Sequence, residues 1–338
     1  MQTPLPRKYA VLLATALTAA LGVSLLALPA AHAQTQTRAW PERPVKIIVP
    51  APPGSAPDAM VRLLGNKLSE VWGQPVTIDN VVGASGNIGT DRAAKAPADG
   101  YTLLYNTIGP IAVNVTLFAG KLPYDPVKDF APISLVVKMP NLLTVHPSSP
   151  HRNVRDLIAA AKKDPGKIRY ATAGPGTTQH LSGELLNTLM GISMTGIPYK
   201  SSAQMTTDAI GGQFELMFHN APVVLPHIKA GNLRALAITS AKRSAAIPEA
   251  PTMSEAGVNG FEVTAWFGFM APAGTPPAVI QKVSADVARL VTTPEVQARM
   301  VADASEPVGS TPDDYAAFIK AEIAKWAAVV KQANMKPE

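Results

Sequence analysis

The sequence of 338 residues contains no cysteine. Disulfide bonds, thiolate metal sites and cysteine nucleophiles are therefore all excluded. Charged residues are also scarce, at 16% against roughly 25% in typical soluble proteins. The formal net charge of +6 is scattered along the chain, without a basic run or interleaved stacking aromatics, which argues against nucleic acid as a partner.

Only the N-terminal region carries a long apolar run. Arg7 and Lys8 precede the uncharged stretch 9–28, and Ala31-His32-Ala33 follows it. Basic residues, an apolar run and a small-x-small site predict a signal peptide at 1–33, cleaved after Ala33. An uncleaved anchor helix is the alternative, but the glycine, serine and proline in and after the run favour cleavage. An exported chain without cysteine fits the periplasm.

Motifs for nucleotides, metals and hydrolysis are missing as well. "GASGNIG" (83–89) is followed by no Lys-Ser or Lys-Thr, and its glycines do not match G-x-G-x-x-G. The histidines form no H-x-x-x-H or H-E-x-x-H pair, and no G-x-S-x-G or S-x-x-K motif marks a nucleophilic serine. We therefore expect a protein that is not an enzyme and that holds no metal and no cofactor.

What the chain does contain is a regular alternation of short apolar runs and helical patterns. Strands are predicted at 45–50, 75–79, 101–106, 133–137, 141–146, 168–172, 194–199, 214–218, 233–239 and 261–270. Helices are predicted at 58–72, 88–96, 154–163, 178–190 and 277–291, and residues 276–336 are almost wholly helical. Alternation of this kind predicts parallel sheets covered by helices, here in two α/β lobes with C-terminal helices packing back on the first.

The loops after these strands are small and rich in Gly, Ser and Thr. They are "PAPPGSAPD" (50–58), "GASGNIG", "TIGP" (107–110), "AGPGTTQH" (173–180), "KSS" (200–202) and "HNAP" (219–222). Ligands of open α/β sheets bind beyond the carboxyl ends of strands, and such loops offer backbone N–H groups and hydroxyls to an anion. Simple tight turns and helix starts, and a structural role for the histidine, are the alternatives. Because an exported protein meets little ATP or NAD, a carboxylate is the anion that we expect.

These segments resemble the Bug family of extracytoplasmic solute receptors, the substrate-binding proteins of tripartite tricarboxylate transporters. The resemblance covers about residues 40–335 and rests on "WPERPVKIIVPAPPGSAPD", "GQPVTIDNVVGASGNIGTDRAAKAPADGYTLLYNT", "ATAGPGTTQHLSGELL" and "AWFGFMAPAGTP". It implies a monomeric two-lobe periplasmic binding protein of type II, a Venus flytrap in which each lobe is a mixed sheet flanked by helices. Lobe 1 would comprise 40–139 plus 266–338, and lobe 2 would comprise 140–265.

The resemblance also implies a function and a set of ligand contacts. The ligand would be a small carboxylate, such as a di- or tricarboxylate or an aromatic acid, delivered to inner-membrane permease subunits. A receptor that reports to a sensor protein and an exported enzyme are the alternatives. The predicted ligand-binding residues are Ala51, Gly54, Ser55, Ser85, Asn106, Thr107, Gly109, Gly174, Gly176, Thr177, Thr178 and His219.

Three positions depart from the family pattern. Ser55 and Ser201 stand where the family usually has glycine, and His219 stands where it often has aspartate. If that aspartate balances the amine of amino-acid ligands, its replacement predicts an anionic ligand without an amine.

Overall fold

The computed structural model describes residues 40–337, so the predicted signal peptide lies outside the described residues. The strands are β1 (Val45–Val49), β2 (Val76–Asn80), β3 (Thr102–Thr107), β4 (Phe130–Val145), β5 (Arg169–Thr172), β6 (Thr195–Pro198), β7 (Leu216–Asn220), β8 (Arg234–Ile238), β9 (Thr264–Pro272) and β10 (Glu306–Pro307). The helices are α2 (Ala56–Trp72), α3 (Asn87–Ala94), α4 (Asn114–Leu117), α5 (Val154–Lys163), α6 (Thr178–Met190), α7 (Ser202–Ile210), α8 (Ala221–Lys229), α9 (Pro277–Val291), α10 (Pro294–Ala302) and α11 (Pro312–Gln332). A 3₁₀ turn (Ala84–Gly86, η1) precedes α3, and a π-helical turn (Gly109–Val113, η2) precedes α4.

The first sheet is built around β1, which pairs in parallel with β2 and β3. Its side chains are buried on both faces, as expected for a strand covered by helices on each side. Val45, Ile47 and Val49 share one core cluster with α2 and α9. Ile48 points the other way, into a cluster with α3, η2 and α11. We call this sheet and its helices the first lobe.

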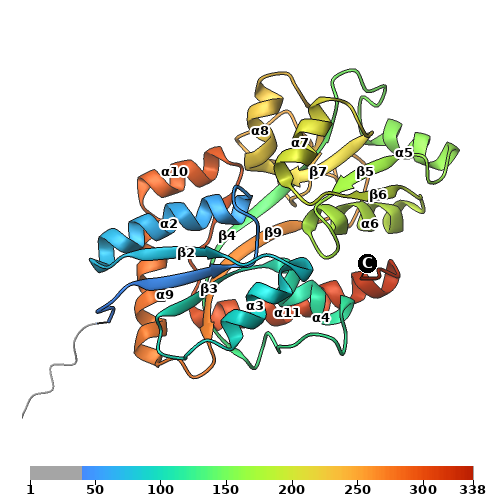
Figure 1. Ribbon diagram of the computed structural model, residues 1–338. Helices are drawn as coiled ribbons and strands as arrows, with labels where there is room; N and C mark the ends of the chain where they lie inside the picture. The colour runs from blue at the N-terminus through green and yellow to red at the C-terminus, as the bar shows by residue number, and fades with distance from the viewer. Residues whose placement is uncertain (1–39, 338) are drawn as a thin grey trace, which may run out of the picture. The chain divides into compact units, whose positions relative to one another are not determined.

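The second sheet consists of β6, β5 and β7 in parallel, with the second half of β4 antiparallel to β7 and β8. Helices α5 to α8 lie among these strands in the chain, and Figure 1 shows them around this sheet. We call this part the second lobe.

The long strand β4 connects the two sheets. Up to Pro140 it pairs with β9, and from Asn141 onwards it pairs with β7 and β8. In Figure 1, β4 and β9 run side by side between the two groups of helices. The sequence prediction of separate strands at 133–137 and 141–146 was therefore wrong, because Pro140 does not interrupt the strand. The mixed sheets that the family resemblance implied are confirmed, since β4 and β9 run antiparallel to their neighbours while β1, β2 and β3 pair in parallel.

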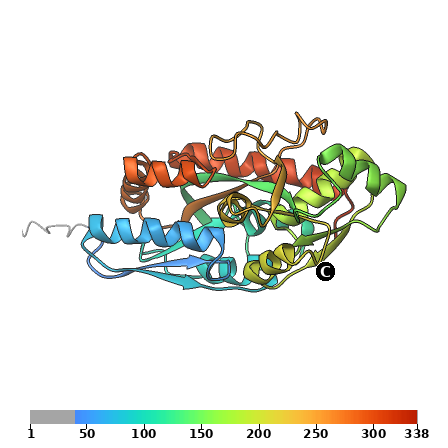
Figure 2. The same ribbon diagram turned by 90° about the horizontal axis from the view of Figure 1, so that it is seen from above.

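The C-terminal helices pack against the first sheet, as predicted. Figure 2 shows α11, the long dark red helix, along one side of the strands, whereas α9 packs with α2 on the opposite face of the first sheet. On the first lobe, the α11 residue Tyr315 donates a hydrogen bond to Asn106 Oδ1 over 2.7 Å, and Glu322 of α11 accepts one from Trp266 Nε1 over 2.8 Å. Within residues 40–337 no helix has both the length and the apolar character needed to span a membrane.

Candidate functional site

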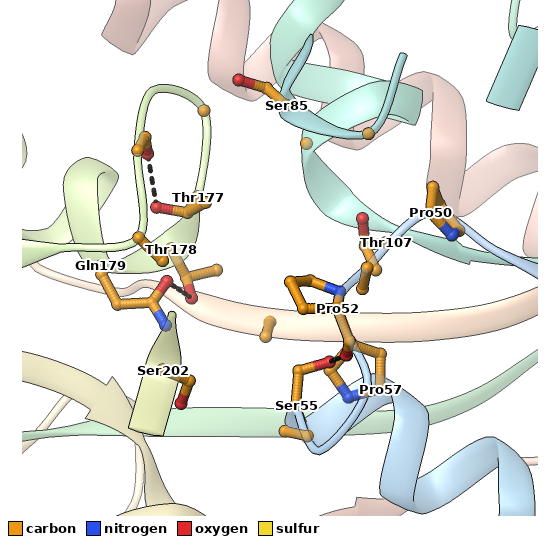
Figure 3. Close-up of a pocket in the computed structure, with 18 of the residues that line it drawn as sticks. Pro50, Pro52, Ser55, Pro57, Ser85, Thr107, Thr177, Thr178, Gln179 and Ser202 are labelled. Carbon is orange, nitrogen blue, oxygen red and sulfur yellow. Dashed lines mark hydrogen bonds between the residues drawn. The ribbon is translucent and has the colours of Figure 1, made fainter. Parts of the chain in front are cut away.

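A cavity of about 710 Å³ lies between the two lobes, at the carboxyl ends of their parallel strands. Figure 3 shows Ser55, Thr107 and three prolines on one side of it, facing Thr177, Gln179 and Ser202 on the other. The lining residues are Pro50, Ala51, Pro52, Ser55, Ala56, Pro57, Val82, Gly83, Ser85, Gly86, Thr107, Ile108, Gly109, Pro110, Ala173, Gly174, Gly176, Thr177, Thr178, Gln179, Pro198, Tyr199, Lys200, Ser202, His219, Asn220, Ala265 and Phe267.

Five helices begin at the cavity wall. Strands β1, β2, β5 and β6 are each followed by a short loop and then by α2, α3, α6 and α7, and β7 is followed directly by α8, so each helix starts at the carboxyl end of its strand. The lining includes the N-cap residues of α2, α3, α6 and α8 and the first residue of α7: Ser55, Gly86, Thr177, Asn220 and Ser202. A helix N-terminus carries unpaired N–H groups and about half a positive charge. The cavity therefore has a positive potential that comes mainly from backbone rather than from ionised side chains.

On the first lobe, the start of α2 is held by the buried carboxylate of Asp58. It accepts hydrogen bonds from the Gly54 N–H over 2.8 Å and from Asn80 Nδ2 over 2.9 Å, and it pairs with Arg62. Burial disfavours the charged form, but the bonds from Arg62, Gly54 and Asn80 outweigh it and lower the pKa of Asp58. The Gly54 amide is thus committed to Asp58 and shapes the loop that bears Ser55.

The glycine-rich loop after β2 has an unusual backbone. Ala84 and Ser85 both have left-handed φ values, 45° and 56°, between two glycines that also have positive φ. A left-handed backbone conformation costs a non-glycine residue about 1 kcal/mol or more, so surrounding contacts must stabilise it here. Asn114 supplies these contacts, since its Nδ2 donates to the Ser85 carbonyl over 3.3 Å and to Asn87 Oδ1 over 2.7 Å. Ser85 is thereby kept at the cavity wall.

On the second lobe, two lining side chains are tied to neighbouring backbone or to the connecting strand. Thr177 caps α6 and donates its hydroxyl proton to the Gly174 carbonyl over 2.7 Å. Asn220 Nδ2 donates to Asn141 Oδ1 over 2.9 Å, where Asn141 is the first residue of β4 that pairs with this sheet. These hydrogen bonds commit the Thr177 hydroxyl proton and one amide proton of Asn220 to the protein itself.

His219 and Lys200 decide the charge of the second wall. His219 is 2% exposed, and burial lowers its pKa to about 4, so it is neutral near pH 7. Lys200 is exposed, and it is the one charged side chain among the described residues that line the cavity. No ion pair involving Lys200 is present within the described lining. Residues 40–337 contain no group of three or more His, Asp or Glu able to hold a metal.

Ten of the twelve predicted ligand-binding residues line this one cavity, and two do not. Gly54 contacts Asp58, and Asn106 is fully buried with its side chain on Tyr315. Six further lining residues were not named among the twelve: Gln179, Tyr199, Lys200, Ser202, Asn220 and Phe267. Four of these lie in the loops "AGPGTTQH", "KSS" and "HNAP" that the sequence already indicated, whereas Tyr199 and Phe267 lie within predicted strands and had no such signal.

A two-lobe α/β fold with a cavity between the lobes, entered at the carboxyl ends of the strands, is that of a periplasmic binding protein. The family described as "Tripartite tricarboxylate transporter family receptor" matches residues 60–335. The chain belongs to this family of periplasmic solute receptors.

Individual relatives cover nearly the whole chain. Protein BugT of Bordetella pertussis is 38% identical over 323 residues, which is 95% of this chain and 98% of BugT. The structure of Rpa4515 from R. palustris with adipate is 39% identical, with a TM-score of 0.84 over 88% of this chain and 100% of that one. MatC from Rhodopseudomonas palustris, with bound malate, is 32% identical, with a TM-score of 0.80 over 86% of this chain and 100% of MatC.

Proposed function

We propose that this receptor captures a small organic carboxylate in the cavity between its lobes and delivers it to a membrane permease. The observation that carries the proposal is the convergence of five helix N-termini on a cavity with one exposed cation. Backbone N–H groups and helix dipoles stabilise an anion without a buried countercharge. Because the described lining contains no carboxylate, it offers no partner to an ammonium group. An anion without an amine therefore suits the cavity best.

The relatives support an acid as ligand. Rpa4515 was solved with adipate and MatC with malate, and both share about a third or more of their residues with this chain. The cavity, at about 710 Å³, is within the usual range for small-molecule sites and leaves room for an acid of that size. Prolines, Ile108 and Phe267 on its wall suit the hydrocarbon part of such a ligand.

Capture would involve closure of lobe 1 (40–139 plus 266–338) on lobe 2 (140–265). The change of strand partners between Pro140 and Asn141, within continuous β4, supports a hinge there. The protein would act as a monomer in the periplasm after cleavage following Ala33, and it would release its ligand chemically unchanged.

Thermal unfolding of the mature chain, from Gln34, against a panel of acids tests this function. The panel contains adipate, malate, citrate, benzoate, glutamate and the neutral analogue adipamide. An acid at about 100 times its dissociation constant stabilises the fold by roughly 2.7 kcal/mol, which raises the midpoint by several degrees. The chain is first unfolded and refolded to remove co-purified ligand. After incubation the acid is recovered and analysed for turnover. No shift with any acid, or a larger shift with glutamate than with the amine-free acids, would contradict the proposal.

A further inference from the structure

His219 and Ser202 form a hydrogen-bonded pair in the second wall of the cavity. His219 lies near the end of β7, and its Nε2 is 2.8 Å from the hydroxyl oxygen of Ser202. Ser202 is the first residue of α7, and Figure 3 shows its side chain at the cavity opposite Ser55. The hydroxyl of Ser202 has no other hydrogen-bond partner within residues 40–337.

The direction of this hydrogen bond follows from the other ring nitrogen. His219 Nδ1 is buried and has no hydrogen-bond partner among the described residues. If Ser202 donated to Nε2, the ring proton would sit on Nδ1 as a buried N–H without an acceptor. With the proton on Nε2, Nδ1 carries an unpaired lone pair instead, and folded proteins tolerate unpaired acceptors more readily than unpaired donors. We therefore assign the proton to Nε2, which donates to the Ser202 oxygen.

This assignment determines what Ser202 can offer a ligand. Its oxygen already accepts a hydrogen bond from the ring N–H, so its own hydroxyl proton is free to point into the cavity. We propose that His219 is a positioning residue that makes Ser202 a hydrogen-bond donor, so that this end of the cavity takes a carboxylate oxygen and rejects an ammonium or amide N–H. The inference rests on the proposed function and names the residues that give it selectivity.

The surroundings of Ser202 favour the same ligand group. Ser201 caps α7 by accepting from the Gln204 N–H, whereas the N–H groups of Ser202 and Ala203 have no acceptor among the described residues. Lys200 lies at the cavity two residues before Ser202. The neighbouring hydroxyl of Thr177 donates to the Gly174 carbonyl, and the amide of Asn220 donates to Asn141. Ser202 is thus the hydroxyl of the second wall placed to bind the ligand.

The tautomer can be measured without any ligand. Long-range ¹H–¹⁵N correlation spectra of the full mature chain report which ring nitrogen of each histidine is protonated, and the signal that disappears in His219→Gln belongs to His219. We expect the proton on Nε2 at pH 7. A proton on Nδ1 would overturn the inference, whatever the ligand proves to be.

Calorimetric titration then tests selectivity with adipate and adipamide, two symmetric probes whose orientation in the cavity does not matter. Ser202→Ala should weaken adipate binding by about 10- to 100-fold, because a hydrogen bond to a charged group is lost. His219→Leu should narrow the preference for adipate over adipamide by about tenfold, since it leaves both lone pairs of the Ser202 oxygen free to accept from an amide N–H. His219→Gln, which keeps a donor, should restore the preference.

The matched control is Ser201→Ala. It removes a hydroxyl that caps the same helix but does not line the cavity, so it should lower stability without changing the preference. If His219→Leu weakens both probes equally, the histidine is only structural and the inference is wrong. If the wild type binds no acid of the panel while the proton is on Nε2, the proposed function fails and the donor assignment stands.

Discussion

Gly109 and Gly176 meet across the cavity: a Cβ atom added to Gly109 would lie 3.2 Å from the carbonyl oxygen of Gly176. Gly109 begins the π-helical turn of the first lobe, and Gly176 belongs to the loop before α6 in the second. A Cβ on Gly176 would lie 2.5 Å from Asn114 Oδ1, the side chain that also holds the strained loop at Ser85. The two lobes therefore reach backbone contact beside the ligand site because both residues lack a side chain.

Gly109→Ala should weaken ligand binding while leaving the ligand-free fold intact. Gly109 does not have a left-handed φ, so alanine adds no backbone strain there. The tight contact of the new methyl group is with the facing lobe, since within its own lobe it meets only the Ser85 carbonyl oxygen at an ordinary 3.8 Å. Overpacking of this kind costs about 1–3 kcal/mol, which corresponds to roughly a 5- to 100-fold higher Kd.

Calorimetric titration with malate and with adipate measures this effect. A cost of closure weakens both acids by the same factor, whereas a collision with the ligand would affect the longer acid more. Gly211→Ala is the control, since its Cβ would lie 3.5 Å from its nearest neighbour and the residue does not line the cavity. Wild-type affinity in Gly109→Ala would show that the lobes need not approach this closely.

Tyr315→Phe should destabilise the fold without changing ligand affinity. The variant removes the partner of Asn106 Oδ1, and Asn106 Nδ2 already has no partner among the described residues. A buried amide left unsatisfied costs about 1–3 kcal/mol, so the unfolding midpoint should fall by a few degrees. Trp326 is also fully buried on α11 but hydrogen-bonds Glu322 rather than Asn106, so Trp326→Phe controls for general loosening of the helix.

Tyr315→Phe also tests whether Asn106 binds the ligand, as the sequence analysis predicted. Asn106 was predicted to bind ligand because the family resemblance implies ligand contacts in the loop after the third strand, residues 106–109. If Tyr315→Phe lowers affinity and leaves stability unchanged, Asn106 acts on the ligand after all.

Much of the fold could be predicted because its patterns are local. Apolar periodicity located β1, β7 and α6, and a threonine cap for α6 could be expected at Thr177 or Thr178, of which the structure has Thr177. The continuous strand β4 could not be predicted in this way. Pro140 signals a break, yet in the structure it stands where the strand changes partners, and only the tertiary pairing with β9 and β7 reveals it.

The candidate site was predictable in position but not in detail. Loops after strands marked the right end of the sheets, and ten of the twelve predicted residues line the cavity. The direction of side chains could not be predicted from the sequence. The Asn106 side chain points to Tyr315 and away from the cavity. Ser202 lines the cavity, although the residue that departs from the family pattern is its neighbour Ser201. The pairing of Ser202 with His219 spans two elements and has no sequence signal.

Lys200→Met should weaken acid binding by no more than about fivefold and should reduce its dependence on salt. An exposed cation contributes about 0.2–1 kcal/mol to an ion pair, and salt screens this contribution. Dissociation constants for adipate at low and at high ionic strength measure the effect. Lys229→Met, at the far end of α8, makes the same charge change away from the cavity and should change neither value. A loss of a hundredfold or more would mean that Lys200, rather than the helix N-termini, supplies most of the binding energy.

Acid should destabilise the protein through His219 well before the carboxylates titrate. Burial lowers the pKa of His219 to about 4, against about 6.5 in the unfolded chain. Between these values the unfolded state binds a proton that the native state does not, so the free energy of unfolding falls as the pH drops from about 6.5 towards 4, by about 3 kcal/mol in all. Urea unfolding at several pH values compares the wild type with His219→Gln, which lacks this loss. Carboxylates with lowered pKa, such as Asp58 and Glu215, lose their contribution at lower pH and act equally in both proteins. The two stability curves should converge as the pH falls, and parallel curves would mean that His219 takes up its proton as readily in the native state as in the unfolded one.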